Sequence, residues 1–159
     1  MAKKKAAKLG RDELADVVKN APLVSIDLIV KNDKGEVLVG LRKNEPAKGF
    51  WFVPGCRILK DERIAEAFGR TGHEELGINL AFEDASFLGV FEHLYPNNFT
   101  EKEDFSTHYV VLAYEVKVPE TLLDLPKAQH SEYKWLSAES LHKEQNVHAY
   151  TKAYFDCHY

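Results

Sequence analysis

Acidic side chains are concentrated in one short stretch of the sequence, GCRILKDERIAEAFGRTGHEELGI, which covers residues 55–78. Asp61 and Glu62 come before a segment with helical periodicity, and Glu74 and Glu75 close that segment just before a glycine. Carboxylate oxygens are the ligands that hard cations such as Mg²⁺ and Mn²⁺ prefer. This stretch therefore predicts a divalent-cation site on a helix.

Helical periodicity identifies Glu75 as the best candidate ligand among these acids. On a helix from Glu62 to Leu76, at about 100° per residue, one apolar arc is expected to face the rest of the fold: Ala65, Phe68, Gly72 and Leu76. Glu75 lies roughly 60° from the centre of that arc. A carboxylate half out of water needs a cation or a strong donor. We therefore predict that Glu75 binds the metal.

The other acids of this helix have alternative roles. Glu66, Arg70 and Glu74 follow one another at i, i+4 spacing on the opposite side, which is typical of a solvated ladder of ion pairs. Arg70 is expected to pair with Glu66 or Glu74. Glu62 lies near the start of the helix, where the dipole favours an acid, so a capping role competes with a catalytic one. At Thr71, where one more acid would complete the set, there is a hydroxyl.

The elements that position this helix can be predicted from periodicity and turn signals. Residues 11–19 predict a short amphipathic helix that ends before Pro22. The other expected elements are strands at 23–30, 36–42, 50–53, 85–95, 107–118 and 133–137 and a helix at roughly 146–156. This order predicts an α+β fold in α/β/α layers, with a mixed sheet flanked by helices. No linker divides the chain, so residues 1–159 are predicted to form one domain.

Composition excludes several classes of protein. The 159 residues are 45% hydrophobic and 29% charged, with a net charge of -4. A nucleic-acid-binding protein would usually be basic, and no apolar run is long enough to span a membrane. The two cysteines, Cys56 and Cys157, indicate free thiols and not a disulfide framework. A cytoplasmic protein is expected.

The acidic stretch resembles a Nudix box, a loop–helix–loop that holds a divalent cation against a nucleoside diphosphate joined to another group. The matching pattern is Gly-x-Arg-x4-Glu, then Arg, then Glu-Glu-Leu-Gly-Ile. Three positions depart from it: Cys56 replaces the second glycine, Thr71 the first glutamate after the arginine, and Gly72 an aliphatic residue. In an ordinary Nudix pyrophosphohydrolase these losses would weaken a multi-metal cluster.

Longer segments resemble one branch of that family, the GDP-mannose mannosyl hydrolases. They are PLVSIDLIV, GLRKNEPAKGFWFVPG, THYVVLAY, QHSEYKWL and NVHAYTKAYF. The resemblance implies a Nudix fold with one Mg²⁺, or Mn²⁺, per subunit. It also implies hydrolysis of GDP-mannose, and of GDP-glucose, to GDP and free sugar by inverting attack at the anomeric carbon. Such attack needs a good leaving group and a base more than clustered metals, so the loss at Thr71 is compatible with activity.

The resemblance also implies roles for the metal ligands and the base. The metal ligands correspond to the backbone carbonyl of Gly55 and the side chains of Glu75 and Gln129. The general base corresponds to His130, in a polar loop expected just before a strand. Histidine has an unperturbed pKa suited to taking a proton from water near neutrality.

Further residues correspond to groups that bind or activate the substrate in this branch. Arg42 corresponds to an arginine on the phosphates, and Arg57 to one that stabilises the departing diphosphate. Tyr109 corresponds to a donor to the leaving oxygen, and His93 to an active-site histidine. Asp27 interrupts an apolar strand, which is more often functional or paired than decorative.

The N-terminal segment, residues 1–21, resembles one that reaches a partner subunit and helps to hold the nucleotide. Lys8, Leu9 and Leu14 would make these contacts in a homodimer.

Two other functions remain open at this stage. A pyrophosphohydrolase that cleaves the phosphoanhydride is favoured by the three glutamates Glu62, Glu74 and Glu75, and disfavoured by Thr71. A catalytically silent module that binds a nucleotide-sugar is permitted by the three departures from the Nudix box. Retention of both Gln129 and His130 argues against the silent module.

Overall fold

The structure, a computed structural model, describes residues 6–102 and 104–156 of the chain. Cys157 and the first lysines of the N-terminal segment lie outside these ranges. The elements, in chain order, are α1 (Arg11–Asn20), β1 (Leu23–Lys31), β2 (Val37–Arg42), β3 (Trp51–Phe52), β4 (Gly55–Arg57), α2 (Ile64–Leu76), η1 (Phe82–Asp84), β5 (Ser86–Tyr95), β6 (Thr107–Lys117), η2 (Glu120–Leu122), β7 (His130–Leu136), α3 (Ala138–Lys143) and α4 (Ala149–Ala153).

The strands form one mixed sheet, as predicted, with seven strands where six were expected. Its main path is β3-β2-β1-β6-β5, with β4 paired to β1 and β7 paired to β2. Strands β1 and β6 run parallel from Leu23↔Tyr109 to Lys31↔Lys117, and the other strand pairs are antiparallel. Strand β1 is therefore central, and its buried residues reach both faces of the sheet.

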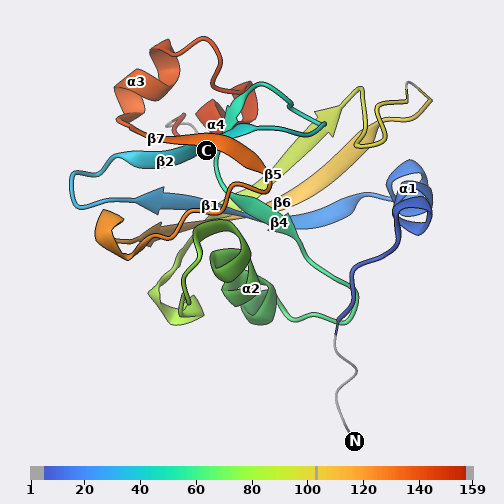
Figure 1. Ribbon diagram of the computed structural model, residues 1–159, viewed down its shortest axis with the longest axis horizontal. Coiled ribbons are helices and arrows are strands. Elements are labelled where there is room, and N and C mark those ends of the chain that lie inside the picture. Colours follow the sequence, from blue (N-terminus) through green and yellow to red (C-terminus); the bar gives the residue numbers. More distant parts are fainter. Residues whose placement is uncertain (1–5, 103, 157–159) are drawn as a thin grey trace, which may run out of the picture.

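Helices cover both faces of the sheet, which confirms the layered α+β prediction (Figure 1). On one face, Ile26, Leu28 and Val30 of β1 pack in a core with Phe68 and Leu76 of α2. On the other face a second core contains the residues Ile29, Val37, Val39, Trp51, Phe52, Leu141, Val147 and Tyr154. Alternation along β1 places Asp27 on this second face, toward the C-terminal helix.

Helix α2 begins and ends at recognisable signals. Glu66 accepts a hydrogen bond from the backbone N–H of Arg63 at 2.9 Å, which closes the N-terminal turn. Gly77 ends the helix in a left-handed conformation with φ of 70°. The prediction for Ala65 is wrong, because its side chain is exposed. The buried arc is rotated toward Thr71 and Glu75, and both of these side chains are buried.

The C-terminal elements differ from the sequence prediction. The helix expected at 146–156 is present as the shorter α4, and α3 was not predicted. Strand β7 begins at His130, so this residue lies in a strand and not in the preceding loop. Strand β4, which follows the Pro54 turn, was not predicted. Within the described residues, no helix is long and apolar enough to cross a membrane.

Candidate active site

A cavity of about 260 Å³ opens where the ends of several strands meet. Its walls come from β1, β2, β4, β5 and β6 and from the end of α2. The predicted site residues in its lining are Lys8, Asp27, Arg42, Gly55, Arg57, His93, Tyr109 and Gln129. The fold thus brings together residues that are far apart in the sequence, as the prediction of a single site requires.

A second cavity, of about 420 Å³, adjoins the first. The two share a boundary formed by Arg42, Pro46, Arg57, Tyr109 and Gln129. The far side of the second cavity is lined by α1 and by the loop that carries Phe99, whose ring lies 5.3 Å from the Arg11 guanidinium carbon. Two cavities that meet at a pair of arginines suit an elongated ligand with an anionic centre.

Asp27 is held tightly between two elements. The Tyr154 hydroxyl donates to Oδ2 of Asp27 at 2.5 Å. The other oxygen lies over Gly55, where a Cβ would be only 2.2 Å from Oδ1, so only glycine fits at this position. Burial raises the pKa of Asp27 to about 7, although the Tyr154 hydrogen bond and the Arg42 charge oppose that change.

His93 lines the same cavity as Asp27, and both side chains contact the Tyr154 hydroxyl. Its ring stacks on Tyr150 at 4.3 Å with an interplanar angle of 3°, and its Nε2 lies 3.3 Å from the Tyr154 hydroxyl. Burial, assisted by the nearby His148, lowers the pKa of His93 to about 4. The ring is therefore neutral near pH 7.

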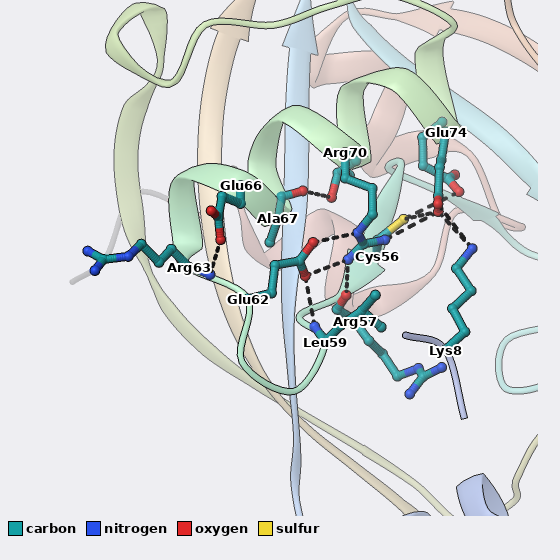
Figure 2. Close-up of polar contacts among 12 residues, drawn as sticks. Lys8, Cys56, Arg57, Leu59, Glu62, Arg63, Glu66, Ala67, Arg70 and Glu74 are labelled. Atoms are coloured by element: carbon teal, nitrogen blue, oxygen red, sulfur yellow. Dashed lines mark hydrogen bonds and ion pairs between the residues drawn. The ribbon is translucent and has the colours of Figure 1, made fainter. Parts of the chain in front are cut away.

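Arg70 organises the acidic helix through four hydrogen bonds (Figure 2). Its guanidinium donates to both carboxylate oxygens of Glu62 at 2.7 and 2.9 Å, to Glu74 at 3.2 Å and to the Arg57 carbonyl at 2.6 Å. Glu62 also accepts from the Leu59 N–H at 2.8 Å. Burial alone would raise the pKa of Glu62, but these hydrogen bonds outweigh it and lower the pKa. The expected Arg70–Glu74 ion pair is present, and both carboxylate oxygens of Glu62 accept hydrogen bonds from Arg70.

Glu74 is compensated by two cations. Besides Arg70, Lys8 lies 3.1 Å from its carboxylate (Figure 2), and the side chain of Glu74 is 30% exposed. Glu74 lines the cavity, so Lys8 links the N-terminal segment to the cavity wall of its own subunit. Leu14 lines the second cavity, whereas Leu9 is exposed and lines neither.

Glu75 lies in a very different environment from its neighbour. The residue is 3% exposed, and the nearest polar groups are the Cys56 thiol at 3.7 Å and the His130 Nδ1 at 3.7 Å. Burial raises the pKa of Glu75 to about 7, with Arg42 acting at longer range to lower it. Because His130 has a pKa lowered by burial to about 4, it does not supply a positive charge near neutrality. Among the described residues, Glu75 is therefore a buried carboxylate that forms no ion pair with a lysine or an arginine.

These surroundings fit the divalent cation implied by the Nudix resemblance. A cation beside Glu75 would offset the cost of burying its charge. Gly55 and Gln129 line the first cavity and would offer a carbonyl and an amide oxygen, donors that suit Mg²⁺ or Mn²⁺, whereas Glu75 is not in that lining. Among the described residues, no three side chains of histidine, cysteine, aspartate or glutamate converge as a metal-binding group.

Thr71 stands where the Nudix box has a glutamate, and Cys56 stands where it has a glycine. Thr71 is fully buried, and its hydroxyl donates to the Ala67 carbonyl at 2.7 Å. The Cys56 thiol lies between Glu74, at 3.8 Å, and Glu75, at 3.7 Å. Burial and the Glu75 charge raise the pKa of Cys56 to about 12, so the thiol is protonated.

His130 is not in the mobile loop position that the sequence suggested. It is 1% exposed and belongs to neither cavity lining. Its ring occupies the space above Gly40, where a Cβ would lie 2.6 Å from the ring carbons. Nδ1 lies 3.4 Å from the Tyr133 hydroxyl, and Nε2 has no partner among the described residues. The imidazole is withdrawn from the cavity in this structure.

Arg42, Arg57 and Tyr109 lie at the boundary between the two cavities. Arg42 is anchored by a hydrogen bond from its Nε to the Pro46 carbonyl at 3.0 Å. Burial raises the pKa of Tyr109, while the two arginines act to lower it. The tyrosine therefore keeps its proton near neutrality and is available as a donor.

Sequence reasoning missed Tyr154, which contacts both Asp27 and His93. The signal was the spacing of Tyr150 and Tyr154. Residues four apart lie on one face of a helix, and both rings point toward the sheet from the C-terminal helix. The spacing alone does not indicate a role in the site, because that role depends on the contact of Tyr154 with Asp27 on β1.

Comparison with known proteins bears on the family of this chain. The NUDIX domain family model matches residues 21–157. The low-salt glycan biosynthesis protein Agl8 of Haloferax volcanii is 39% identical over 155 residues, which cover 98% of this chain and 94% of that protein.

Two solved structures are similar over most of the chain. A MutT protein from Methanosarcina mazei is 25% identical with a TM-score of 0.68, and the match covers 86% of this chain and 93% of that one. A MutT NUDIX hydrolase from Burkholderia pseudomallei has the same identity and TM-score, with 86% and 98% covered.

Proposed function

This chain belongs to the Nudix family of hydrolases, and from that premise we propose that it hydrolyses a GDP-sugar to GDP and free sugar. The substrate is GDP-mannose, with GDP-glucose as a second substrate. Water attacks the anomeric carbon with inversion, and Mg²⁺, or Mn²⁺, is required at one site per subunit.

The state of the helix carboxylates carries this proposal. Glu62 is bound bidentately by Arg70, Glu74 is compensated by Arg70 and Lys8, and Thr71 is a buried hydroxyl. Glu75 alone combines burial with a lack of a nearby cation. One carboxylate fits one metal, whereas attack at phosphorus commonly draws on clustered metals that clamp both reacting oxygens.

The paired cavities support a ligand with a diphosphate in the middle. Arg42 and Arg57 lie where the cavities meet and suit bidentate contact with phosphate oxygens. The first cavity offers Asp27 and His93 to the sugar. The second offers the apolar surface of Leu14 to the nucleoside.

The residues of the chain divide the chemistry among them. The C–O bond between the anomeric carbon and the diphosphate breaks as water forms the new bond on the opposite face, and His130 takes the proton of that water. Arg57 stabilises the departing GDP, and Tyr109 donates a hydrogen bond to its leaving oxygen. Bound Mg²⁺ would lower the charge of the leaving diphosphate. Because His130 is buried above Gly40, this role requires its ring to turn toward the cavity.

The similarity to Agl8 is compatible with a sugar-containing substrate, since the name of that protein refers to glycan biosynthesis. A homodimer in which residues 1–21 reach the partner, and a cytoplasmic location, remain parts of the proposal. Sedimentation would test the homodimer, and a monomer would remove the proposed contacts of Lys8, Leu9 and Leu14 with the partner.

Cleavage of the phosphoanhydride by the same fold is the second candidate. Glu62, Glu74 and Glu75 are all present, and release of Glu62 from Arg70 would make a second carboxylate available. The all-oxygen donors near Glu75 serve either reaction, so the two candidates are separated by the bond that breaks.

Product analysis in ¹⁸O-labelled water tests the proposal. We expect GDP-mannose and Mg²⁺ to give GDP and free mannose, with the label in mannose. Label in GMP or mannose 1-phosphate would mean attack at phosphorus and would remove the assigned role of His130. His130→Gln should lose turnover while still binding the nucleotide-sugar. Binding without turnover in the unmodified protein would identify the silent module.

A further inference from the structure

The hydroxyl of Tyr154 joins two site residues that come from different strands. Tyr154 directly follows α4 and is 6% exposed. Its oxygen lies 2.5 Å from Oδ2 of Asp27 on β1 and 3.3 Å from Nε2 of His93 on β5. Among the side-chain hydrogen bonds of the described residues, those of Tyr154 reach both Asp27 and His93.

We propose that Tyr154 is a positioning residue that holds Asp27 and His93 in one arrangement and fixes the tautomer of His93. In that tautomer Nε2 carries the proton, and Nδ1 accepts a hydrogen bond from a hydroxyl group of the ligand. The identification of that hydroxyl with the sugar of a GDP-sugar rests on the proposed function. The hydrogen-bond chain itself does not.

Counting protons gives the direction of the chain. A tyrosine hydroxyl has one proton, and Tyr154 donates it to Asp27 when that carboxyl is ionised, which is its main form above its pKa of about 7. The hydroxyl can then only accept from His93, so the contact at 3.3 Å is a hydrogen bond when Nε2 is protonated. A neutral imidazole carries one proton, which leaves Nδ1 as an acceptor.

Nδ1 of His93 is the nitrogen left for a ligand. His93 lines the first cavity. Among the described residues, the hydrogen-bond contact of the His93 side chain is the one between Nε2 and Tyr154. The side-chain nitrogens that are fully buried without a partner belong to His108 and His130 and not to His93. With Nε2 taken by Tyr154, the remaining nitrogen can therefore accept from a hydroxyl donor in the cavity. A substrate that lacks this hydroxyl should bind less well in the transition state.

Tyr154 itself does not line either cavity. Its ring packs edge-on against Phe91 at 4.7 Å, within the core between the sheet and the C-terminal helices. Its influence on a ligand must therefore pass through Asp27 and His93. This placement distinguishes a positioning residue from one that touches the substrate.

The substitution Tyr154→Phe removes the hydroxyl and keeps the ring. We expect kcat/KM for GDP-mannose to fall about tenfold, the scale of one lost hydrogen bond, while inhibition by GDP stays unchanged because the arginines are untouched. Tyr150→Phe is the matched control, because Tyr150 lies in α4, four residues before Tyr154. Among the described residues its hydroxyl bonds the backbone of Leu94, at 2.7 and 2.9 Å, and neither Asp27 nor the His93 side chain, so the variant should keep kcat/KM.

Nitrogen NMR of the histidine side chains provides a readout that needs no turnover. At pH 8, where Asp27 is ionised, we expect His93 of the unmodified protein to be neutral with its proton on Nε2, and in Tyr154→Phe we expect a mixture of tautomers. A proton on Nδ1 in the unmodified protein, or an unchanged tautomer in Tyr154→Phe, would overturn the proposal. If the unmodified protein cleaves no GDP-sugar, the proposed function fails, and the tautomer alone decides the role of Tyr154. Normal turnover by Tyr154→Phe would overturn this inference and leave the proposed function intact.

Discussion

Glu74 and Glu75 are neighbours in the sequence, but the fold surrounds them with different charges. Arg70 and Lys8 contact Glu74, so its negative charge is balanced within the chain. Glu75 faces a protonated thiol and a neutral imidazole. Burial in such surroundings raises the pKa of Glu75 to about 7, and an added cation would stabilise its anion.

A pair of matched substitutions tests this difference at the residue scale. We expect Glu75→Gln to lower metal-dependent turnover by about 100-fold or more, since a ligand should matter at least as much as the groups that orient it. Glu74→Gln should keep most of the turnover. Titration of activity with Mg²⁺ measures both. Comparable losses would show that Glu74, which lines the cavity, also binds the metal.

Sequence reasoning selected eight of the seventeen residues that line the first cavity, and Asp27, Arg42 and Arg57 among them combine an unusual local position with a family pattern. It did not find Tyr154, whose partner is 127 residues away in the chain. The burial of His130 was also missed. That burial depends on Gly40 across the sheet, and a pairing partner in another strand leaves no local signal.

At the scale of elements, helix α2 carries Thr71 at the position where the Nudix box has a glutamate. Thr71 is fully buried and bonded to its own helix, and the Cys56 thiol from β4 fills the adjoining space. The two departures from the Nudix box are therefore neighbours in the fold. Together they leave no room for another solvated carboxylate.

Thr71→Glu should consequently destabilise the fold without restoring a metal cluster. We expect the free energy of unfolding to fall by about 3 kcal/mol, because an unpaired charge is forced into a buried position. Urea denaturation measures this change. Ala65→Glu places the same charge on the exposed side of the same helix and should change stability by about 0.5 kcal/mol or less. A stable Thr71→Glu variant that releases GMP would contradict this explanation.

The long strands and helices α1 and α2 were predictable because their hydrophobic periodicity is strong. The phase of α2 was less certain, since Ala65 is apolar yet exposed while Thr71 is polar yet buried. Strand β4 has only three residues, too few for a periodic signal, and it exists because β1 pairs with it. Helix α3 depends on Ser137, whose side chain accepts from the Ser140 N–H at 3.1 Å.

At the scale of the whole molecule, the buried histidines couple folding to pH. His93 is packed against Tyr150, Tyr154 and His148, and it reaches the Asp27 carboxylate only through the Tyr154 hydroxyl. Burial lowers its pKa from 6.5 to about 4. Between these values the unfolded chain binds a proton that the folded protein does not.

The contribution of His93 to stability should therefore be lost as the pH is lowered from about 6.5 to about 4, at most about 3 kcal/mol. Above pH 6.5 this contribution is fully present, because the histidine is neutral in both states. The raised pKa values of Asp27 and Glu75 act in the opposite direction over this range, so His93 is tested by the difference between two proteins that share these carboxyls. His93→Phe keeps an aromatic ring against Tyr150 and removes the titrating group. Urea denaturation at pH 7 and pH 4.5, with a chelator present, should show that the change from pH 7 to pH 4.5 is less unfavourable to the variant than to the unmodified protein. Equal losses in the two proteins would mean that His93 takes up its proton without disturbing the packed face between β5 and α4.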